Sequence, residues 1–281
     1  MKFAYFPGCS VESTALEYGQ SVEEIFTFLG VDLREIRTWN CCGASSGHVM
    51  NPELTLALSG RNLFLAEQMS MDMLTLCPAC FIRHKAAQNE LKENRHLKTK
   101  IEKDIGRNLE LSSKIRHVIE VLYYDVGIKL IQEKVRKSLK GLRVVPYYGC
   151  YLVRPHEIAD YDDRENPIIL EKLMESIEVE CIDWPCKVDC CGASLGVTNP
   201  EIVKRLIAKI ANTAHELGAE AIVTACPLCE TNLDIYQSNS TRIPILFFSE
   251  IIALAFGSLR VKEWIKRHLI SPFSVLEKFK L

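Results

Sequence analysis

The sequence lacks three features that would each indicate a familiar class of protein. Charge of one sign is absent, since 34 Lys and Arg nearly balance 36 Asp and Glu, so we expect no nucleic-acid partner. No G-x-G-x-x-G stretch occurs, which argues against a bound nicotinamide or flavin. The longest apolar run, residues 243–257, contains Pro244 and Glu250 and is too short to cross a bilayer, so we expect no direct membrane span.

The first residues also lack the basic and then apolar pattern of a secretory signal, so we expect a reducing, cytoplasmic setting. Cysteine, by contrast, is abundant. Its twelve copies fall in C-C and C-x-x-C motifs, which in a reducing compartment indicate metal ligands more than disulfides.

Two copies of one pattern follow each other along the chain. A single cysteine comes first, then C-C-G-A-S, then N-P-E, and finally C-P-x-C. The gap between the single cysteine and the pair is 31 residues in the first copy and 39 in the second, and 34 residues separate the pair from C-P-x-C in both. The repeat predicts two similar halves.

Each half alternates short apolar runs with helical patterns. Strands are predicted at residues 2–6, 73–76, 142–147 and 221–224, and helices at 15–29, 54–69, 167–177 and 202–217. The alternation predicts an α/β fold with two pseudo-symmetric halves, each a mainly parallel sheet flanked by helices. The first cysteine and the C-P-x-C motif of each copy follow a strand, so we expect them at the carboxyl ends of the sheets.

The two halves are expected to divide near residue 116. Residues 1–116 would hold the first repeat with a charged linker, because residues 83–116 carry ten Lys or Arg against five Asp or Glu and suggest exposed helix. Residues 117–281 would hold a connecting helix at about 118–139, the second repeat and a C-terminal helical tail.

Five cysteines in each copy are one more than a single metal ion needs. Structural zinc and an ordinary cubane iron-sulfur cluster each take four thiolates. Adjacent cysteines also chelate one ion poorly, because neighbouring side chains of an extended chain point to opposite sides. The count favours an unusual multi-iron cluster, with a zinc-stabilised scaffold as the alternative.

The neighbours of the cysteines suit a cluster. Pro78 and Pro227 are suited to begin helices whose free N–H groups would face the sulfurs. Gly43 and Gly192 follow the cysteine pairs, and glycine also precedes the first cysteine of each copy. These glycines permit close approach of the backbone to a cluster, although ordinary turns would use them too.

These motifs, together with G-C-Y-L-V-R-P at residues 149–155, resemble the duplicated cysteine-rich CCG domain of the heterodisulfide reductase family, in its B-subunit branch. The resemblance spans nearly the whole chain. It implies two non-cubane [4Fe-4S] clusters facing one cavity between the halves. The ligands would be Cys9, Cys41, Cys42, Cys77 and Cys80 for one cluster, and Cys150, Cys190, Cys191, Cys226 and Cys229 for the other.

The resemblance also implies an activity. Family members are catalytic oxidoreductase subunits that cleave a disulfide into two thiols, and in methanogenesis the substrate joins coenzyme M to coenzyme B. They work beside a ferredoxin-like iron-sulfur subunit and a flavoprotein or membrane haem subunit. The alternative is an iron-sulfur subunit that relays electrons in an oxidase or sulfur-metabolism complex without catalysis.

Several residues outside the two sets remain open. His48 could donate a proton to a departing thiolate or simply face water. Cys181 and Cys186, which have no counterpart in the first copy, are expected to be small buried apolar residues, with an accessory redox or metal role as the alternative.

Cationic residues follow both first-copy and second-copy cysteines. Arg83, His84 and Lys85 come after Cys80, and Arg154 and His156 come after Cys150. They could bind the anionic tails of coenzyme-like thiols or form a solvated surface. In the second copy, the residues that follow Cys229 include Glu230 and Asn232 in place of the cations that follow Cys80.

The tail, residues 258–281, carries six Lys or Arg among apolar residues and is expected to pack as an amphipathic helix, or else to dock a subunit.

Overall fold

Two four-stranded parallel sheets form the centre of the protein, as a computed structural model shows for residues 1–44, 47–238, 242–279 and 281 (side chains of 48 and 49 excepted). The sheet orders are β2-β1-β3-β4 and β6-β5-β7-β8, so the second half repeats the topology of the first. The first sheet contains β1 (Lys2–Phe6), β2 (Asp32–Glu35), β3 (Met73–Thr75) and β4 (Ile115–His117). The second contains β5 (Arg143–Tyr147), β6 (Glu180–Cys181), β7 (Ala221–Thr224) and β8 (Ile245–Phe247).

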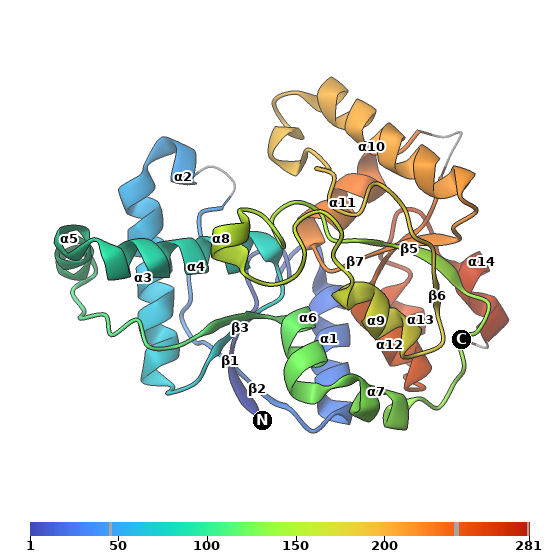
Figure 1. Ribbon diagram of the computed structural model, residues 1–281, viewed down its shortest axis with the longest axis horizontal. Coiled ribbons are helices and arrows are strands. Elements are labelled where there is room, and N and C mark those ends of the chain that lie inside the picture. Colours follow the sequence, from blue (N-terminus) through green and yellow to red (C-terminus); the bar gives the residue numbers. More distant parts are fainter. Residues whose placement is uncertain (45–46, 239–241, 280) are drawn as a thin grey trace.

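Helices cover the faces of both sheets (Figure 1). Those of the first half are α1 (Leu16–Phe28), α2 (Gly47–Met50), α3 (Pro52–Gln68), α4 (Pro78–Glu93), α5 (Arg95–Ile105) and α6 (Val118–Glu120), followed by the π-helical η1 (Val121–Val126) and α7 (Ile128–Lys134). Those of the second half are α8 (His156–Ala159), α9 (Ile169–Glu175), the 3-10 helix η2 (Ala193–Leu195), α10 (Pro200–Glu216), α11 (Pro227–Tyr236), α12 (Phe248–Ala255), α13 (Val261–Trp264), α14 (Phe273–Leu276) and η3 (Glu277–Phe279). The predicted α/β fold with two similar halves is confirmed.

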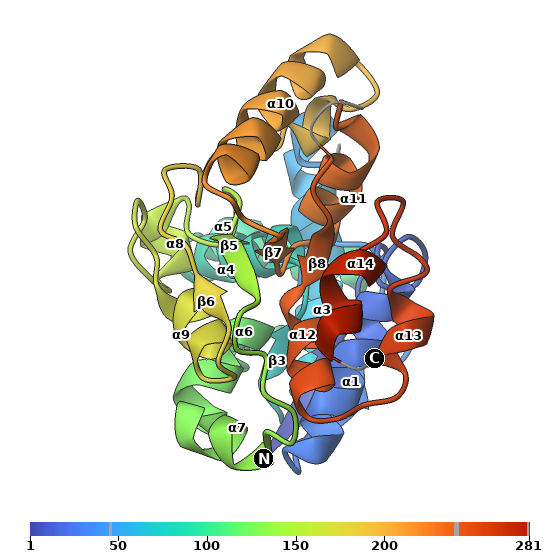
Figure 2. The same ribbon diagram turned by 90° about the vertical axis from the view of Figure 1, so that its right-hand side faces the viewer.

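The two halves interlock through the helix that follows the last strand of each sheet. Helix α12, which follows β8, packs against α1 of the first half, and α6 with η1, which follow β4, pack against α9 of the second half. Figures 1 and 2 both show blue α1 beside red α12. The Ser21 and Ser249 hydroxyls lie 2.7 Å apart across this contact, and Tyr18 stacks on Phe247 with ring centroids 4.3 Å apart.

The predicted helices at residues 15–29, 54–69, 167–177 and 202–217 are present as α1, α3, α9 and α10. The expected helix at 118–139 is wrong in its continuity. It breaks at Gly127, whose φ of 83° is left-handed, and residues 135–142 leave the helical conformation altogether. Glycine has no Cβ and adopts this φ at little steric cost, so the chain turns at Gly127.

The charged segment at 83–116 is also less exposed than expected. Helix α4 contains the beginning of this segment, and it buries His84, Ala87 and Leu91 against the rest of the N-terminal half of the protein. Strand β4 ends the segment and completes the first sheet. The charged residues of these helices face outward while their apolar residues face the core, so the excess of Lys and Arg did not indicate that one face is buried.

The interlocked helices predict that the halves unfold together. Phe256, at the end of α12, is fully buried and its ring contacts Phe28 of α1 with centroids 5.8 Å apart. We expect Phe256→Ala to lower the free energy of unfolding by about 3–5 kcal/mol in a single transition, because it leaves a cavity between the halves. Chemical denaturation followed by circular dichroism measures this loss.

The matched control is Phe273→Ala, because Phe273 is 49% exposed. We expect this change to cost under about 1 kcal/mol. Equal losses for the two variants, or separate transitions for the two halves, would contradict an interlocked core.

Candidate metal centre between the two halves

The five cysteines of the first copy gather at the carboxyl ends of β1, β2 and β3. Cys9 follows β1, the Cys41–Cys42 pair follows β2, and Cys77 and Cys80 begin α4 after β3. The sulfurs form two close pairs, Cys9 with Cys41 at 3.9 Å and Cys42 with Cys80 at 3.3 Å. Parallel strands bring these loops to one edge of the sheet, as the sequence predicted for Cys9 and the C-P-x-C motif.

The second copy repeats the arrangement with its own strands, β5, β6 and β7. Its sulfur pairs are Cys150 with Cys190 at 4.0 Å and Cys191 with Cys229 at 3.5 Å. The pairing is the same by position in the motif: the single cysteine meets the first of the adjacent pair, and the last of C-P-x-C meets the second. All twelve cysteines, which the structure describes, are free thiols.

The two sets of thiols meet at their inner members. Cys77 and Cys226, both buried, lie close enough for their thiols to shift each other's pKa. The buried Tyr18 hydroxyl spans the same junction, since it lies 3.1 Å from the Leu76 carbonyl oxygen and 2.9 Å from that of Ala225. These carbonyls directly precede Cys77 and Cys226, so one hydroxyl hydrogen is shared between the two cysteine loops.

The first cysteine of each adjacent pair is exposed and favours the thiolate. Hydrogen bonds from the Cys42 and Cys9 thiols, with one from the Gly43 N–H, lower the pKa of Cys41. A hydrogen bond from the Cys150 thiol, aided by the Gly192 N–H, lowers the pKa of Cys190 to about 6. Thiolate is the form of cysteine that binds metal, so these positions are prepared for ligation.

Backbone groups approach the sulfurs closely. The Gly192 nitrogen lies 3.3 Å from the Cys190 sulfur, and the Cys229 nitrogen, in the first turn of α11, lies 3.4 Å from the Cys226 sulfur. A Cβ on Gly149 would lie 2.9 Å from the Cys229 sulfur, closer than real Cβ contacts allow. Glycine is therefore required at this position by the sulfur beside it, as well as by its φ of 66°.

The donor set fits a multinuclear cluster of a soft metal. Among the described residues, a group of three donors close enough for one ion is found at Glu230, Asp234 and His268, and no three thiols form such a group. The thiols instead lie in pairs around a shared space. Five soft donors with this spread match iron-sulfur chemistry better than the closed tetrahedron of a structural zinc site.

A cavity of about 110 Å³ lies between the second thiol set and three residues of the first half, Ala44, Pro78 and Ala79. Most of its lining is apolar and comes from both halves: Ala44, Pro78, Ala79, Tyr148, Cys150, Tyr151, Cys190, Cys191, Ala193, Ser194, Cys226, Leu228 and Cys229. Thiols of the second set open directly onto this space. A mostly apolar pocket with a few polar groups is a usual place for a small-molecule ligand.

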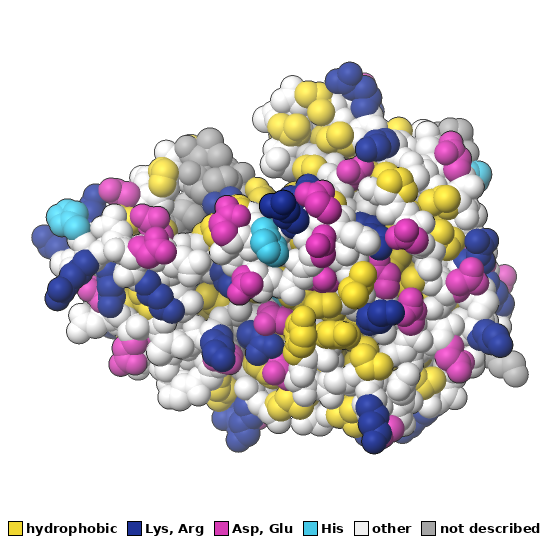
Figure 3. All heavy atoms as spheres, in the orientation of Figure 1, with side chains coloured by type: hydrophobic (Ala, Val, Ile, Leu, Met, Phe, Trp, Pro, Cys, Tyr) yellow, Lys and Arg dark blue, Asp and Glu magenta, His cyan; other side chains and the backbone are white. Residues whose placement is uncertain are grey.

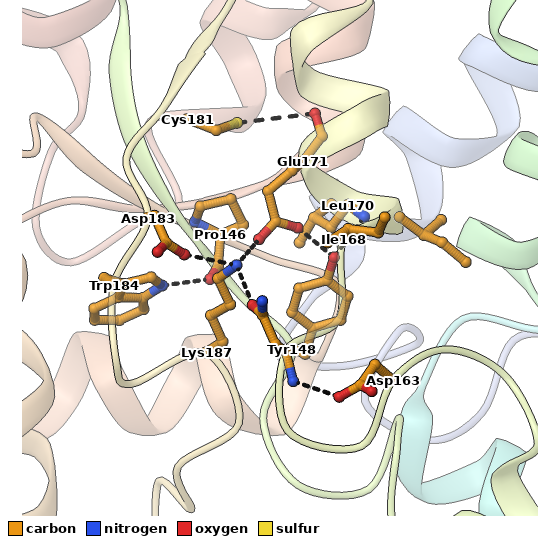
Figure 4. A network of polar contacts seen from close by, with 12 residues as sticks. Pro146, Tyr148, Asp163, Ile168, Leu170, Glu171, Cys181, Asp183, Trp184 and Lys187 are labelled. Atoms are coloured by element: carbon orange, nitrogen blue, oxygen red, sulfur yellow. Dashed lines mark hydrogen bonds and ion pairs between the residues drawn. The ribbon is translucent and has the colours of Figure 1, made fainter.

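A buried lysine fixes the loop that carries Cys150 (Figure 4). The Lys187 ammonium lies 2.9 Å from a Glu171 oxygen and donates to the Asn166 side-chain oxygen at 2.8 Å. The Lys187 carbonyl oxygen accepts hydrogen bonds from the Tyr148 and Gly149 N–H groups at 2.9 and 3.2 Å. Glu171 in turn accepts a hydrogen bond from the Tyr148 hydroxyl. The ion pair of Lys187 with Glu171 is thereby linked to the backbone just before Cys150.

A buried asparagine pins each adjacent cysteine pair. Asn62 of α3 donates to the Asn40 carbonyl oxygen at 2.8 Å and accepts from the Asn40 N–H at 3.0 Å. Asn232 of α11 donates to the Cys191 carbonyl oxygen at 2.6 Å. Asn232, which follows Cys229 where the first copy has cationic residues, therefore stabilises the loop of the second cysteine pair.

The cationic residues that follow Cys80 and Cys150, for which binding of anionic tails was one possibility, lie away from the cavity. His84 is buried, and burial lowers its pKa to about 4, so it is a neutral ring held by the Cys80 carbonyl oxygen at 2.7 Å. Lys85 donates to the Ala159 carbonyl oxygen at 2.7 Å, and Arg154 pairs with Glu165 at 2.7 Å. The described lining of the cavity includes neither these residues nor Arg83 nor His156. Over the face in Figure 3, charges of both signs alternate.

The other singled-out residues have simpler outcomes. Cys186 is buried and Cys181 is partly buried at the end of β6, both apart from the two thiol sets. Burial raises the pKa of the Cys181 thiol, which keeps it in the unreactive form. The side chain of His48 lies outside the described residues.

The C-terminal tail packs against the protein, but its described residues form two short α-helices and a 3-10 helix and not one amphipathic helix. Trp264 is fully buried and donates to the Gln20 side chain of α1 at 3.0 Å, whereas Leu269 is 69% exposed. Pro272 comes between α13 and α14, where it interrupts any continuous helix.

Sequence reasoning missed Tyr18, Lys187 and His268. Tyr18 sits in an ordinary helical pattern, and a lysine or histidine in a loop is normally at least partly exposed to water. Nothing local in the sequence marks these residues, since each gains its role from partners far away along the chain.

Comparison with known proteins agrees with the repeat. The family model described as a cysteine-rich domain, CCG, matches twice, at residues 3–83 and 144–234. The membrane anchor subunit of the 8-methylmenaquinol:fumarate reductase of Wolinella succinogenes is 33% identical over 266 residues, which cover 91% of this chain and 92% of the relative. In the described part of the present chain, no helix combines the length and apolarity that a membrane crossing needs.

Two further relatives bear the name of one reductase. A protein of Archaeoglobus profundus, named for its likeness to the heterodisulfide reductase B-subunit, is 30% identical, with 92% of this chain and 91% of the relative covered. The B-subunit of the ferredoxin:CoB-CoM heterodisulfide reductase of Methanosarcina mazei is 29% identical, with 99% and 96% covered. A crystal structure of a hypothetical protein from Helicobacter pylori has the same fold, with a TM-score of 0.72, 12% identity and coverage of 96% of this chain and 52% of that one.

The buried lysine behind Cys150 yields a prediction about stability. We expect Lys187→Met to lower the free energy of unfolding by about 3–5 kcal/mol, because Glu171 is left buried without its cation. Lys209→Met removes an ion pair to Asp189 at 2.7 Å from a lysine whose side chain is 63% exposed, and should cost under about 1 kcal/mol. Urea unfolding compares the two variants, and equal losses would show that the buried network does not hold this loop.

Proposed function

This chain belongs to the cysteine-rich CCG domain family, in the duplicated form that it shares with the B-subunits of heterodisulfide reductases, and we propose that it is the catalytic iron-sulfur subunit of such a reductase. In this proposal each five-cysteine set binds one non-cubane [4Fe-4S] cluster. The substrate is a small disulfide, of the kind that joins coenzyme M to coenzyme B, and the products are two thiols.

The observation that carries the proposal is the approach of the two thiol sets to each other at Cys77 and Cys226, beside an apolar cavity that the second set lines. Cleavage of a disulfide adds two electrons and two protons to one S–S bond and yields two thiols, so each sulfur needs a soft partner while charge develops on it. The iron-sulfur clusters, when bound, supply the electrons and the soft iron. Two sets in contact through Cys77 and Cys226 offer one partner to each half of the substrate.

The residues of the chain contribute position and environment. Tyr18 holds the two C-P-x-C loops at a fixed separation, and Lys187 holds the Cys150 loop against the cavity. The apolar lining from Ala79, Tyr151 and Leu228 excludes water from the reacting sulfurs. Exclusion of water strengthens every electrostatic interaction within the cavity.

Electrons must come from partner subunits under this proposal. The sequence has no dinucleotide fingerprint that would bind a flavin or nicotinamide. The resemblance to heterodisulfide reductase B-subunits implies a ferredoxin-like iron-sulfur subunit together with a flavoprotein or a membrane haem subunit as the partners. The exposed Cys9, Cys41 and Cys190 give an electron donor access to the sulfur atoms themselves.

The Wolinella succinogenes relative supports a second candidate. Its name describes a subunit of a quinol:fumarate reductase, so a chain of this family also serves where the reaction involves no disulfide. Under this alternative the two clusters relay electrons between partners and no bond is cleaved at the cavity.

Metal content and a simple assay separate these possibilities. We expect anaerobically purified protein to contain about eight iron and eight sulfide per chain. Given reduced viologen and a heterodisulfide, the catalytic subunit releases two thiols per disulfide. Iron-replete protein that releases no thiol would favour the relay, whereas about two zinc and no iron would overturn both candidates.

Gly149 provides a test of the second set alone. We expect Gly149→Ala to lose roughly half of the iron, because its Cβ would lie 2.9 Å from the Cys229 sulfur. The control is Gly141→Ala, since Gly141 also has a positive φ, of 90°, but nothing lies within 4 Å of its added Cβ. The control carries the same kind of backbone strain, so it should keep its iron. An equal loss of iron from both variants would contradict an iron-sulfur cluster whose Cys229 ligand packs against Gly149.

A further inference from the structure

A cluster of buried acidic side chains surrounds His268 behind the second thiol set. The carboxylates belong to Glu17, Glu230, Asp234 and Glu250, and each of these residues is at most 7% exposed. They come from α1, α11 and α12, and His268 comes from the tail between α13 and α14. Figure 2 shows this red C-terminal segment beside α11, α12 and α1.

Three of these residues converge as a ligand set. Glu230 and Asp234 lie one turn apart on α11, so their side chains share a face of the helix. One oxygen from each and a ring nitrogen of His268 all lie within 4.8 Å of one another. Two carboxylates and an imidazole are ordinary ligands of a divalent transition metal.

The outer contacts orient the ligands in the way that metal sites require. The His268 Nε2 lies 3.0 and 3.1 Å from the two Glu250 oxygens, so it donates its hydrogen to that carboxylate. Nδ1 is then the nitrogen that faces the cluster. It is buried and makes no hydrogen bond, although a Glu230 oxygen lies 3.3 Å away. A histidine that donates one N–H to a carboxylate presents its other nitrogen to a metal in most such sites.

The acidic ligands are oriented too. The two Asp234 oxygens accept hydrogen bonds from the Leu269 and Ile270 N–H groups at 2.6 and 2.9 Å. The second Glu230 oxygen lies 3.2 Å from the Thr231 hydroxyl. Each carboxylate retains unused lone pairs, so these contacts fix its direction without saturating it.

Charge in the cluster is out of balance. Four buried carboxylates face one imidazole and two arginines, Arg267 at 3.9 Å from Glu17 and Arg242, which acts on Asp234 electrostatically. Buried carboxylates without a counter-charge are costly, and an ion of charge +2 would offset the excess.

We propose that Glu230, Asp234 and the Nδ1 atom of His268 bind a divalent transition-metal ion, with Glu250 as the hydrogen-bond acceptor that orients the histidine. The ion would fasten the C-terminal tail to α11, the helix that carries Cys229. This site is separate from the ten thiols and does not depend on what they bind.

Binding of Mn²⁺ to the purified full chain tests the proposal. Mn²⁺ favours oxygen and nitrogen donors over thiolates, so the cysteines do not compete for it. We expect about one equivalent to bind, seen as loss of the electron paramagnetic resonance signal of free Mn²⁺. Pulsed measurements should detect nitrogen from a directly coordinated imidazole. Asp234→Asn and His268→Gln should each weaken binding by roughly tenfold or more.

His215→Gln is the control, because this histidine is exposed on α10. Binding should be unchanged in this variant. If the wild-type chain binds no Mn²⁺ at millimolar concentration, or the bound ion shows no nitrogen coupling, the proposal is wrong and His268 is a protonated partner of Glu230 and Glu250. That readout uses wild-type protein alone, so it stands even if the substituted chains do not fold.

Discussion

The contact between Cys77 and Cys226 is the constraint on which the rest of the structure depends. These buried thiols come from equivalent positions of two repeats, 149 residues apart in sequence, and both begin a helix at the carboxyl end of a central strand. Two soft donor sets can serve one small molecule only if the halves meet at this point.

Three devices keep the halves in this position. The exchanged packing of α12 on α1 and of α6 on α9 makes each half complete the core of the other. Tyr18 lies at the centre of that exchange and spans both C-P-x-C loops through one hydroxyl. Lys187 adds a buried charge that fixes the Cys150 loop from behind. Because these contacts are buried and hydrogen-bonded, they hold the cavity open against collapse onto its own sulfurs.

The sequence predicted the repeat, the α/β class and the edge of the sheet at which the thiols gather, because periodicity and spacing report directly on strands, helices and their ends. It did not predict which sulfurs pair, since Cys42 meets Cys80 through the fold and not through spacing. It misled at His84, where a charged neighbourhood in sequence conceals a buried neutral ring. Short edge strands such as β2 and β6 also escaped, because polar residues at an edge carry no alternating pattern.

The most direct measurement of the central claim is a crystal structure of anaerobically prepared protein with anomalous scattering recorded at the iron edge. The account predicts two separate groups of iron, one within reach of each five-cysteine set, on either side of the cavity that Cys226 lines. A single metal atom in either set, or cysteines of one set joined as disulfides, would contradict it.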